Sequence, residues 1–119
     1  MRLRFPRSAR LAQSADFARV RHEGRAHHGR CMVLTVLPTG TEQPSRAGIV
    51  TGRRVGGAVE RVRVRRRLRE LVRLDRPQLA SGMWFVLVAK KRAAEVDFST
   101  LRTEWRNLAL AAGLLALAP

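Results

Sequence analysis

The residues of this chain best suited to chemistry are arginines, and many of them are gathered in one short segment. From residue 53 to residue 69 the sequence reads RRVGGAVERVRVRRRLR. A guanidinium group binds phosphate through two parallel N–H donors and also stacks on nucleobases. The chemistry that this segment offers is therefore the recognition of a polyanion, above all a nucleic acid.

The other reactive side chains do not form a catalytic or metal-binding pattern. The nine acidic residues contain no pair of carboxylates placed to hold two metal ions, and no Ser/His/Asp set stands out. His22, His27 and His28 lack cysteine or acidic partners at ligand spacing. The single cysteine, Cys31, is typical of a buried strand residue. We therefore expect no catalytic residue and no metal site in this chain.

Composition extends the basic character to the whole chain of 119 residues. Its 24 Lys and Arg residues against nine Asp and Glu give a formal net charge of +15, and 45% hydrophobic residues exclude a disordered basic tail. The lone cysteine allows no internal disulfide, the N-terminus lacks the apolar core of a signal peptide, and no apolar run could span a bilayer. We expect one cytoplasmic domain over residues 1–119, with residues 1–13 as a flexible basic arm.

Most of the arginines are expected to lie on a helix over residues 58–74. Its buried stripe follows from apolar residues at i, i+4, i+7 and i+8, namely Val64, Leu68, Leu71 and Val72. At 100° per residue, the flank beside this stripe carries Arg65, Arg66, Arg69 and Arg73. Val62 falls among these arginines, whereas Arg63 and Arg67 cover the far side.

The remaining pattern supplies the elements that must position this helix. A first helix begins at Ser14, carries Phe17 and Val20 on one face, and ends at Gly24. Strands are expected over residues 31–37, 47–51 and 84–89, with a short edge strand within 25–30. A last helix begins at Asp97 or Ser99. The resulting order, α-β-β-β-α-β-α, predicts an α/β (α+β) two-layer sandwich with a small mixed central sheet and about three helices.

With these elements in place, the chain resembles the protein subunit of bacterial ribonuclease P. The hallmark of that family is a helix opened by glycine and then Ala-Val-x-Arg-Asn-Arg-x-Lys/Arg-Arg. The corresponding stretch here, residues 56–66, reads GGAVERVRVRR. The strand and basic pair of residues 48–55 match as well, as does the first helix over residues 16–20 with its glycine at 24. The resemblance implies a fold like the second domain of ribosomal protein S5, with an uncommon left-handed crossover.

The resemblance also implies a function in which the protein does not cleave its substrate. In the family, a large RNA holds Mg²⁺ and hydrolyses the bond that joins the 5′ leader to precursor tRNA. The implied partners are this ribonuclease P RNA and precursor tRNA, with no membrane, no obligate protein partner and no metal bound strongly by the protein alone. The surface for the catalytic RNA would carry Arg61, Arg63, Arg65, Arg66 and Arg69. The cleft for the leader would carry Phe17, Arg21, Thr35, Thr51, Arg53 and Arg54.

Three positions depart from the family pattern. Val62 replaces the asparagine between the paired arginines, which the family links to metal ions and RNA contact. Arg21 replaces a second aromatic residue on the first helix, and Thr35 replaces a tyrosine on the following strand. With no tyrosine in the chain, we expect the leader to be bound more by charge and less by stacking.

Other functions share part of this pattern. A ribosomal or ribosome-assembly protein would have the same charge, size and sandwich, but it would not need a cleft for single strands beside Phe17. A DNA-binding regulator would place the arginine helix in a major groove. That helix lacks the Asn, Gln and Ser side chains that read base edges. Val62 also leaves open a degenerate relative of the family, and Phe17 could be a plain core residue.

Overall fold

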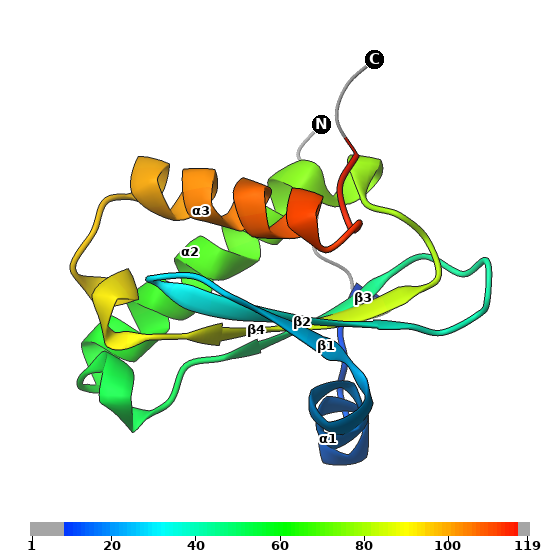
Figure 1. Cartoon of the computed structure of the whole chain (residues 1–119). Coiled ribbons are helices and arrows are strands. Elements are labelled where there is room, and N and C mark those ends of the chain that lie inside the picture. The colour runs from blue at the N-terminus through cyan, green and yellow to red at the C-terminus, as the bar shows by residue number, and fades with distance from the viewer. Residues whose placement is uncertain (1–8, 117–119) are drawn as a thin grey trace.

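The computed structural model describes residues 9–116, and residues 1–8 and 117–119 lie outside the described part of the chain. Most of the predicted N-terminal arm is therefore outside it. The elements follow the predicted order (Figure 1): α1 (Ser14–Glu23), β1 (Arg25–His28), β2 (Met32–Pro38), β3 (Arg46–Val50), α2 (Ala58–Asp75), β4 (Met83–Ala89) and α3 (Phe98–Ala111). Short 3₁₀ turns lie between them: η2 (Arg53–Val55), η3 (Arg76–Gln78) and η4 (Lys91–Ala94).

The four strands form one mixed sheet in the order β1-β2-β4-β3. β1 pairs with β2, and β2 with β4, in antiparallel fashion, whereas β3 and β4 are parallel. β4 is thus an inner strand, and its residues Phe85, Val86 and Leu87 are buried, as expected for an apolar run that is covered on both faces. The predicted central strand and the predicted edge strand within residues 25–30 are both confirmed.

Helices cover both faces of this sheet. Figure 1 shows α2 and α3 on one face and α1 on the other. The larger core cluster lies beneath α2 and α3 and contains Phe85 and Trp105, and the smaller one lies beneath α1 and contains Val20 and Val86. Phe85 and Val86 are neighbours on β4 and point to opposite faces because side chains alternate along a strand. The predicted sheet-and-helix sandwich is confirmed, and α1 adds a partial third layer.

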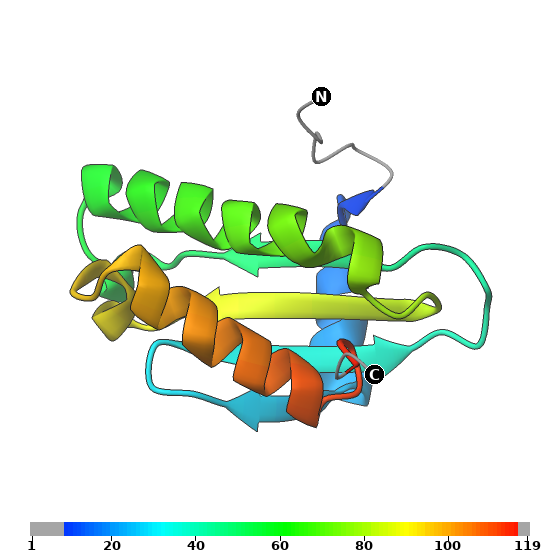
Figure 2. The same ribbon diagram turned by 90° about the horizontal axis from the view of Figure 1, so that it is seen from above.

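The connection from β3 through α2 to β4 has the uncommon hand. Figure 2 views the sheet from the side of α2; when the view is turned so that β3 and β4 point upward, β4 lies to the left of β3. This crossover is therefore left-handed, whereas about 98% of such connections are right-handed. Gly56, just before α2, has a φ angle of 149°, a backbone conformation that residues with a Cβ atom rarely adopt.

The helix ends agree with the sequence at one site and differ at another. Asp97 caps α3, because its carboxylate accepts a hydrogen bond from the backbone N–H of Thr100 at 2.9 Å. Hydrogen bonding to Thr100, first through its side chain and then through its backbone N–H, lowers the pKa of the Asp97 carboxyl. Ser14, the predicted cap of α1, is instead the first helical residue, and the preceding Gln13 makes no side-chain cap bond. The pattern placed this boundary one residue late, as is common for helix ends.

The last residues of the predicted arm lie against the sheet. Arg10 forms a parallel bridge with Ala47 of β3, and the backbone N–H of Leu11 donates to the carbonyl of Ala47 at 2.9 Å. Ala9 and Leu11 are both buried. The flexible-arm prediction therefore concerns residues 1–8, because residues 9–11 are held by edge strand β3.

A buried carboxylate joins α2 to α3. Asp75 is 3% exposed and accepts hydrogen bonds from the indole N–H of Trp105 at 2.8 Å and from Arg106 at 2.7 Å. Trp105 is itself fully buried and packs on Phe85.

Within residues 9–116, no helix is long and apolar enough to cross a membrane.

We expect Asp75→Ala to lower the free energy of unfolding by about 1–3 kcal/mol, because it leaves the buried N–H of Trp105 without an acceptor. Trp105→Phe with Asp75→Ala in the same chain should cost less than the sum of the two single changes, because the second change removes the orphaned donor. Chemical denaturation of the four proteins measures this cycle. Additive losses would show that the bond does not couple the two helices.

Candidate nucleic-acid interface

The arginines of α2 are divided among three sides of the helix. Val64, Leu68, Leu71, Val72 and Asp75 form the buried side. Arg65 and Arg69 lie on the flank toward β3, Arg63 lies on the flank toward η4, and Arg66 points outward. Arg61, in the first turn, is half-buried. The structure therefore does not bring the five predicted arginines onto one continuous face.

The flank toward β3 holds a group of like charges. Arg65 donates from Nη2 to the hydroxyl of Thr51 at 2.9 Å, just beyond the end of β3. The Nε of Arg69 is buried and has no hydrogen-bond partner among the described residues. Burial, together with the nearby charges of Arg10 and Arg65, lowers the pKa of Arg69. An anion in this region would satisfy the orphaned donor and relieve the repulsion.

The opposite flank fixes the segment before α3. Arg63 donates to the carbonyl of Ala94 at 2.8 Å, and Arg67 donates to the carbonyl of Val96 at 3.0 Å. Each guanidinium has five donors, so each retains others for a second partner. Arg63 is exposed and can still meet phosphate, but part of its role is to hold this segment.

An apolar spot interrupts the arginines near the start of α2. Val59 is 79% exposed and Val62 is 42% exposed. The prediction that Val62 lies off the apolar stripe is confirmed. Within the described residues, Val59 and Val62 are two of the three large hydrophobic side chains that are exposed, and Leu74 is the third.

The second surface lies on the other face of the sheet, beside α1. Strand register places Val50 next to Val88 and Val88 next to Val33. We call these three residues the open valine row, because all three are only half-buried. The adjacent row toward α1, Gly48, Val86 and Thr35, is buried. Figures 1 and 2 show why: α1 crosses the strands at a steep angle and covers only part of this face.

Phe17 and Arg21 border the open valine row. An added Cβ on Gly48 would lie 2.4 Å from Cε1 of Phe17, so the ring rests on the backbone of β3. Arg19 lies over the ring of Trp84, 5.6 Å from its centroid, on the other flank of α1. Arg21 is two positions from Arg19 and therefore about 200° around the helix. Arg21 thus shares the flank of Phe17, and the Phe17 side chain is half-buried.

The other predicted cleft residues are divided. Arg53 and Arg54 are exposed in η2, beyond the β3 end of the open valine row. Thr35 is buried beneath α1, where its methyl group approaches Gly24. Thr51 is buried and bonded to Arg65. Thr35 and Thr51 thus support the surface from within, and Thr51 connects it to α2.

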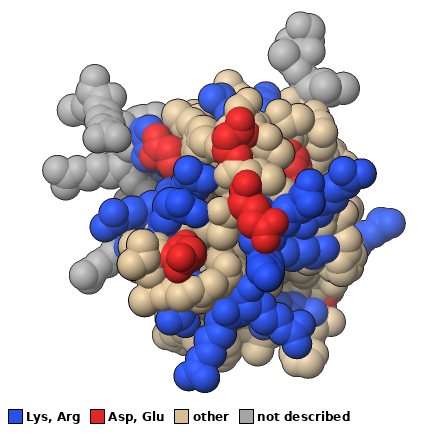
Figure 3. Space-filling model, turned by 90° about the vertical axis from the view of Figure 1, so that its left-hand side faces the viewer, with Lys and Arg blue, Asp and Glu red and all other residues tan. Residues whose placement is uncertain are grey.

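Charge favours a polyanion at both surfaces. Figure 3 looks at the end of the molecule where α2 begins, and Lys and Arg side chains spread over much of this face with fewer Asp and Glu among them.

Among residues 9–116, no three His, Cys, Asp or Glu side chains lie close enough together to hold a metal ion. Burial and the Glu104 carboxylate raise the pKa of the Cys31 thiol, which opposes formation of a nucleophilic thiolate.

Comparison with known proteins decides the family. The family model described as Ribonuclease P matches residues 5–113. The chain is 39% identical to the Ribonuclease P protein component of Symbiobacterium thermophilum over 89% of this chain and 92% of that protein. It is 41% identical to that of Chloroflexus aggregans over 92% of this chain and 81% of that protein. This chain belongs to the ribonuclease P protein family.

Solved structures of ribonuclease P proteins have the same fold. The protein from Thermotoga maritima has a TM-score of 0.74 and 31% identity over 83% of this chain and 93% of that one. The protein from Staphylococcus aureus has a TM-score of 0.83 and 19% identity over 91% of this chain and 98% of that one. These matches confirm the resemblance and the predicted fold, and they give no support to a ribosomal protein or a DNA-binding regulator.

Sequence reasoning missed several residues at or near these two candidate surfaces. Arg10 was assigned to a flexible arm, and only the bridge to β3 places it near Arg69. The open valine row depends on register between three strands, which the pattern of one strand cannot give. Arg76 continues the helical spacing of Arg65 and Arg69, and that spacing was a usable signal.

Proposed function

We propose that this chain is the protein subunit of ribonuclease P, which binds both the catalytic RNA and the 5′ leader of precursor tRNA. It thereby assists the endonucleolytic removal of the leader that gives the mature 5′ end. The observation that carries the proposal is the presence of two differently built surfaces that meet at the bond between Arg65 and Thr51. One surface is a rigid helix of arginines, and the other is an open apolar row bordered by one aromatic ring.

The helix suits a folded RNA partner. Arg65, Arg66 and Arg69 can meet phosphates at positions fixed by a helix whose opposite side is buried in the core. Phosphate contacts set register and affinity but carry no base sequence. Such a surface recognises the shape of a folded RNA backbone, which is what a permanent RNA partner requires.

The open valine row suits a leader of variable sequence. A base stacked on an aromatic ring contributes about 1–3 kcal/mol, and every base has a face that can stack. Phe17 supplies the ring, the valines supply apolar contact, and Arg21, Arg53 and Arg54 supply charge for phosphates. The row therefore takes single-stranded RNA without selecting a sequence.

In this proposal, hydrolysis belongs to the RNA subunit. Mg²⁺ held by that RNA would supply the chemistry, namely activation of water and stabilisation of the leaving oxygen. In the described part of the chain, no three His, Cys, Asp or Glu side chains lie close enough together to hold a metal ion. In this proposal, the protein acts by holding leader and catalytic RNA together. Its benefit is greatest when Mg²⁺ is scarce, because arginines then supply the countercharge that folded RNA needs.

Reconstitution tests the proposal directly. We expect the protein to stimulate cleavage of precursor tRNA by a bacterial ribonuclease P RNA at low Mg²⁺, with a gain in substrate affinity that grows when a leader is present. The measurement is single-turnover cleavage with and without protein. A folded protein that binds structured RNA but gives no stimulation would refute this function.

The role of α2 is tested by Arg65→Ala together with Arg69→Ala. We expect affinity for the catalytic RNA to fall at least about tenfold, because charged hydrogen bonds are lost. The slope of log affinity against log salt should fall by about one for each phosphate contact removed. Filter binding across a salt series measures both.

Two further variants separate charge from position at this site. Arg102→Ala removes one charge from an exposed position on α3 and should leave the slope unchanged. Thr51→Val keeps every charge and removes the acceptor that orients Arg65. Its effect should appear in affinity but not in the slope. An effect of Arg102→Ala about half as large as that of the double change on α2 would show that only net charge matters.

The role of the open valine row is tested by Phe17→Ala. We expect weaker binding of precursor tRNA to the reconstituted enzyme by about 1–3 kcal/mol, from the loss of one stacked base, and unchanged binding of mature tRNA. Binding of the two tRNAs to one enzyme preparation is the measurement. Equal losses for both would remove Phe17 from the leader site and leave it as a core residue.

A further inference from the structure

A separate hollow lies at the far end of α2, away from the glycines that begin the helix. Its volume is about 300 Å³, and it opens between η3 and the loop that leads into β3. Its walls come from Pro44, Ser45, Arg73, Arg76, Pro77 and Leu79. Arg73 comes from the last turn of α2 and Arg76 from the turn that follows it, and the other wall residues lie outside the two surfaces described above.

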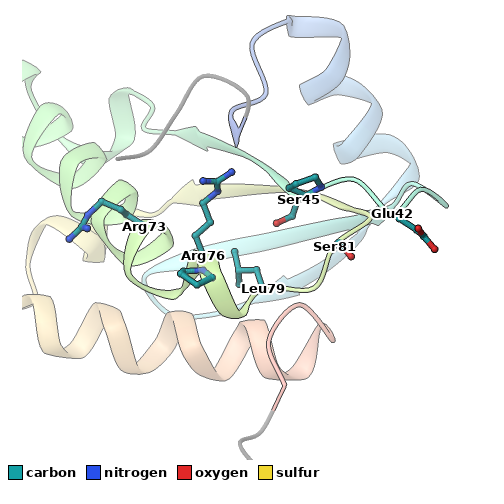
Figure 4. A pocket seen from close by; sticks show the side chains of 8 residues that line it. Glu42, Ser45, Arg73, Arg76, Leu79 and Ser81 are labelled. Atoms are coloured by element: carbon teal, nitrogen blue, oxygen red, sulfur yellow. The ribbon is translucent and has the colours of Figure 1, made fainter. Parts of the chain in front are cut away.

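Arg76 gives the hollow its charge. Within residues 9–116, the structure records no hydrogen bond or ion pair for its guanidinium, although the side chain is half-buried. Figure 4 shows it rising from the end of the helix between Arg73 and Ser45. Arg73 is held by Glu70, whose carboxylate accepts from Nε at 2.8 Å. Arg76 therefore keeps its forked donors for a ligand, whereas Arg73 adds charge from a fixed position.

Away from the arginines, the hollow combines apolar groups with two serines, Ser45 and Ser81. Pro44, Pro77 and Leu79 present rings and methyl groups, and Ser45, which is 7% exposed, places a hydroxyl on the wall. Glu42 lies on the rim at the loop, away from Arg76 in Figure 4. Its carboxylate repels anions, so a negative group is favoured only at the arginine end. A ligand that matches this arrangement has a phosphate at one end and a flat, largely apolar body at the other.

The hollow is also continuous with the arginines assigned to RNA. Arg65, Arg69 and Arg76 lie at i, i+4 and i+11, which is within about 40° on one flank of the helix. At 1.5 Å per residue, the distance along the axis from Arg65 to Arg76 is about 16 Å. A strand of a few nucleotides covers that length. An RNA backbone that follows this flank therefore reaches the hollow.

We propose that this hollow is a nucleotide pocket that takes one unpaired nucleotide of the RNA bound along α2. The phosphate binds Arg76, and the base lies against Pro44, Pro77 and Leu79. The identity of that RNA as the catalytic RNA rests on the proposed function, but the pocket itself does not. It would give the helix a contact with a base as well as with phosphates, at a site that selects an unstacked nucleotide.

The test uses the full chain without any RNA. Adenosine 5′-monophosphate is titrated while backbone amide signals are followed by NMR, with adenosine and inorganic phosphate as separate probes. We expect saturable shifts at Ser45, Leu79 and Ser81, and tighter binding of the monophosphate than of either part alone. Arg76→Gln should weaken this binding at least about tenfold through loss of a charged hydrogen bond.

Matched variants make the result decisive. Arg102→Gln removes the same charge from the exposed side of α3 and should leave the monophosphate affinity unchanged. Arg76→Lys keeps the charge without the fork and should give an intermediate affinity. The amide spectrum of each variant checks that it is folded.

Three outcomes would overturn the pocket: no shift at these amides, equal affinity in Arg76→Gln, or equal affinity for phosphate alone. Stimulation of the ribonuclease P RNA is measured separately, so failure of the pocket and failure of the proposed function are distinguishable.

Discussion

Repulsion between the arginines of α2 is the constraint on which the rest of the structure depends. Like charges at i, i+4 destabilise an isolated helix, and Arg61, Arg65 and Arg69 form such a series. Burial of Val64, Leu68, Leu71 and Val72, each at most 1% exposed, holds the helix in place against that repulsion. The fold thus keeps the arginine cations close together at fixed positions. An anionic partner that binds them would relieve their mutual repulsion, and this relief would add to the affinity.

The same constraint explains how the neighbouring segments are arranged. Carbonyl oxygens of Ala94 and Val96 accept from Arg63 and Arg67, and the buried carboxylate of Asp75 accepts from α3. Backbone carbonyl acceptors therefore face α2 from η4 and from the segment before α3. On the side of β3, the described residues offer Arg65 the hydroxyl of Thr51, and they leave the Nε of Arg69 without an acceptor. This asymmetry favours the β3 flank for a phosphate backbone.

The fold could be predicted from the sequence to a large extent because its signals are local. The buried stripe of α2, the apolar run of β4 and Asp97 at the start of α3 each depend on neighbouring residues, and each is confirmed. The site was less accessible because it depends on distant pairs. Thr51 was expected in a cleft, but its position is set by a hydrogen bond from Arg65, a residue 14 positions away in the sequence.

Two further features could not be predicted for related reasons. The position of Phe17 depends on the absence of a side chain at Gly48. Gly48 lies on β3, which is separated from α1 in the sequence by β1 and β2. From the sequence alone, Asp75 is expected to be a solvent-exposed residue at the end of a helix. Its burial depends on α3, whose Trp105 lies 30 residues further along the chain. A pattern that repeats within one element predicts burial, whereas a contact between elements requires their register and crossing angle.

Val62 shows what a change at an exposed position can and cannot affect. The family motif has asparagine here, and the valine is 42% exposed beside a Val59 that is 79% exposed. Neither side chain contributes much buried area, so the fold does not depend on them. Under the proposed function, the change from asparagine to valine would therefore act on the contact with RNA rather than on the fold. An asparagine offers two donors and an acceptor to that RNA, whereas valine offers only apolar contact, so here the flanking arginines must supply the polar contacts of this helix face.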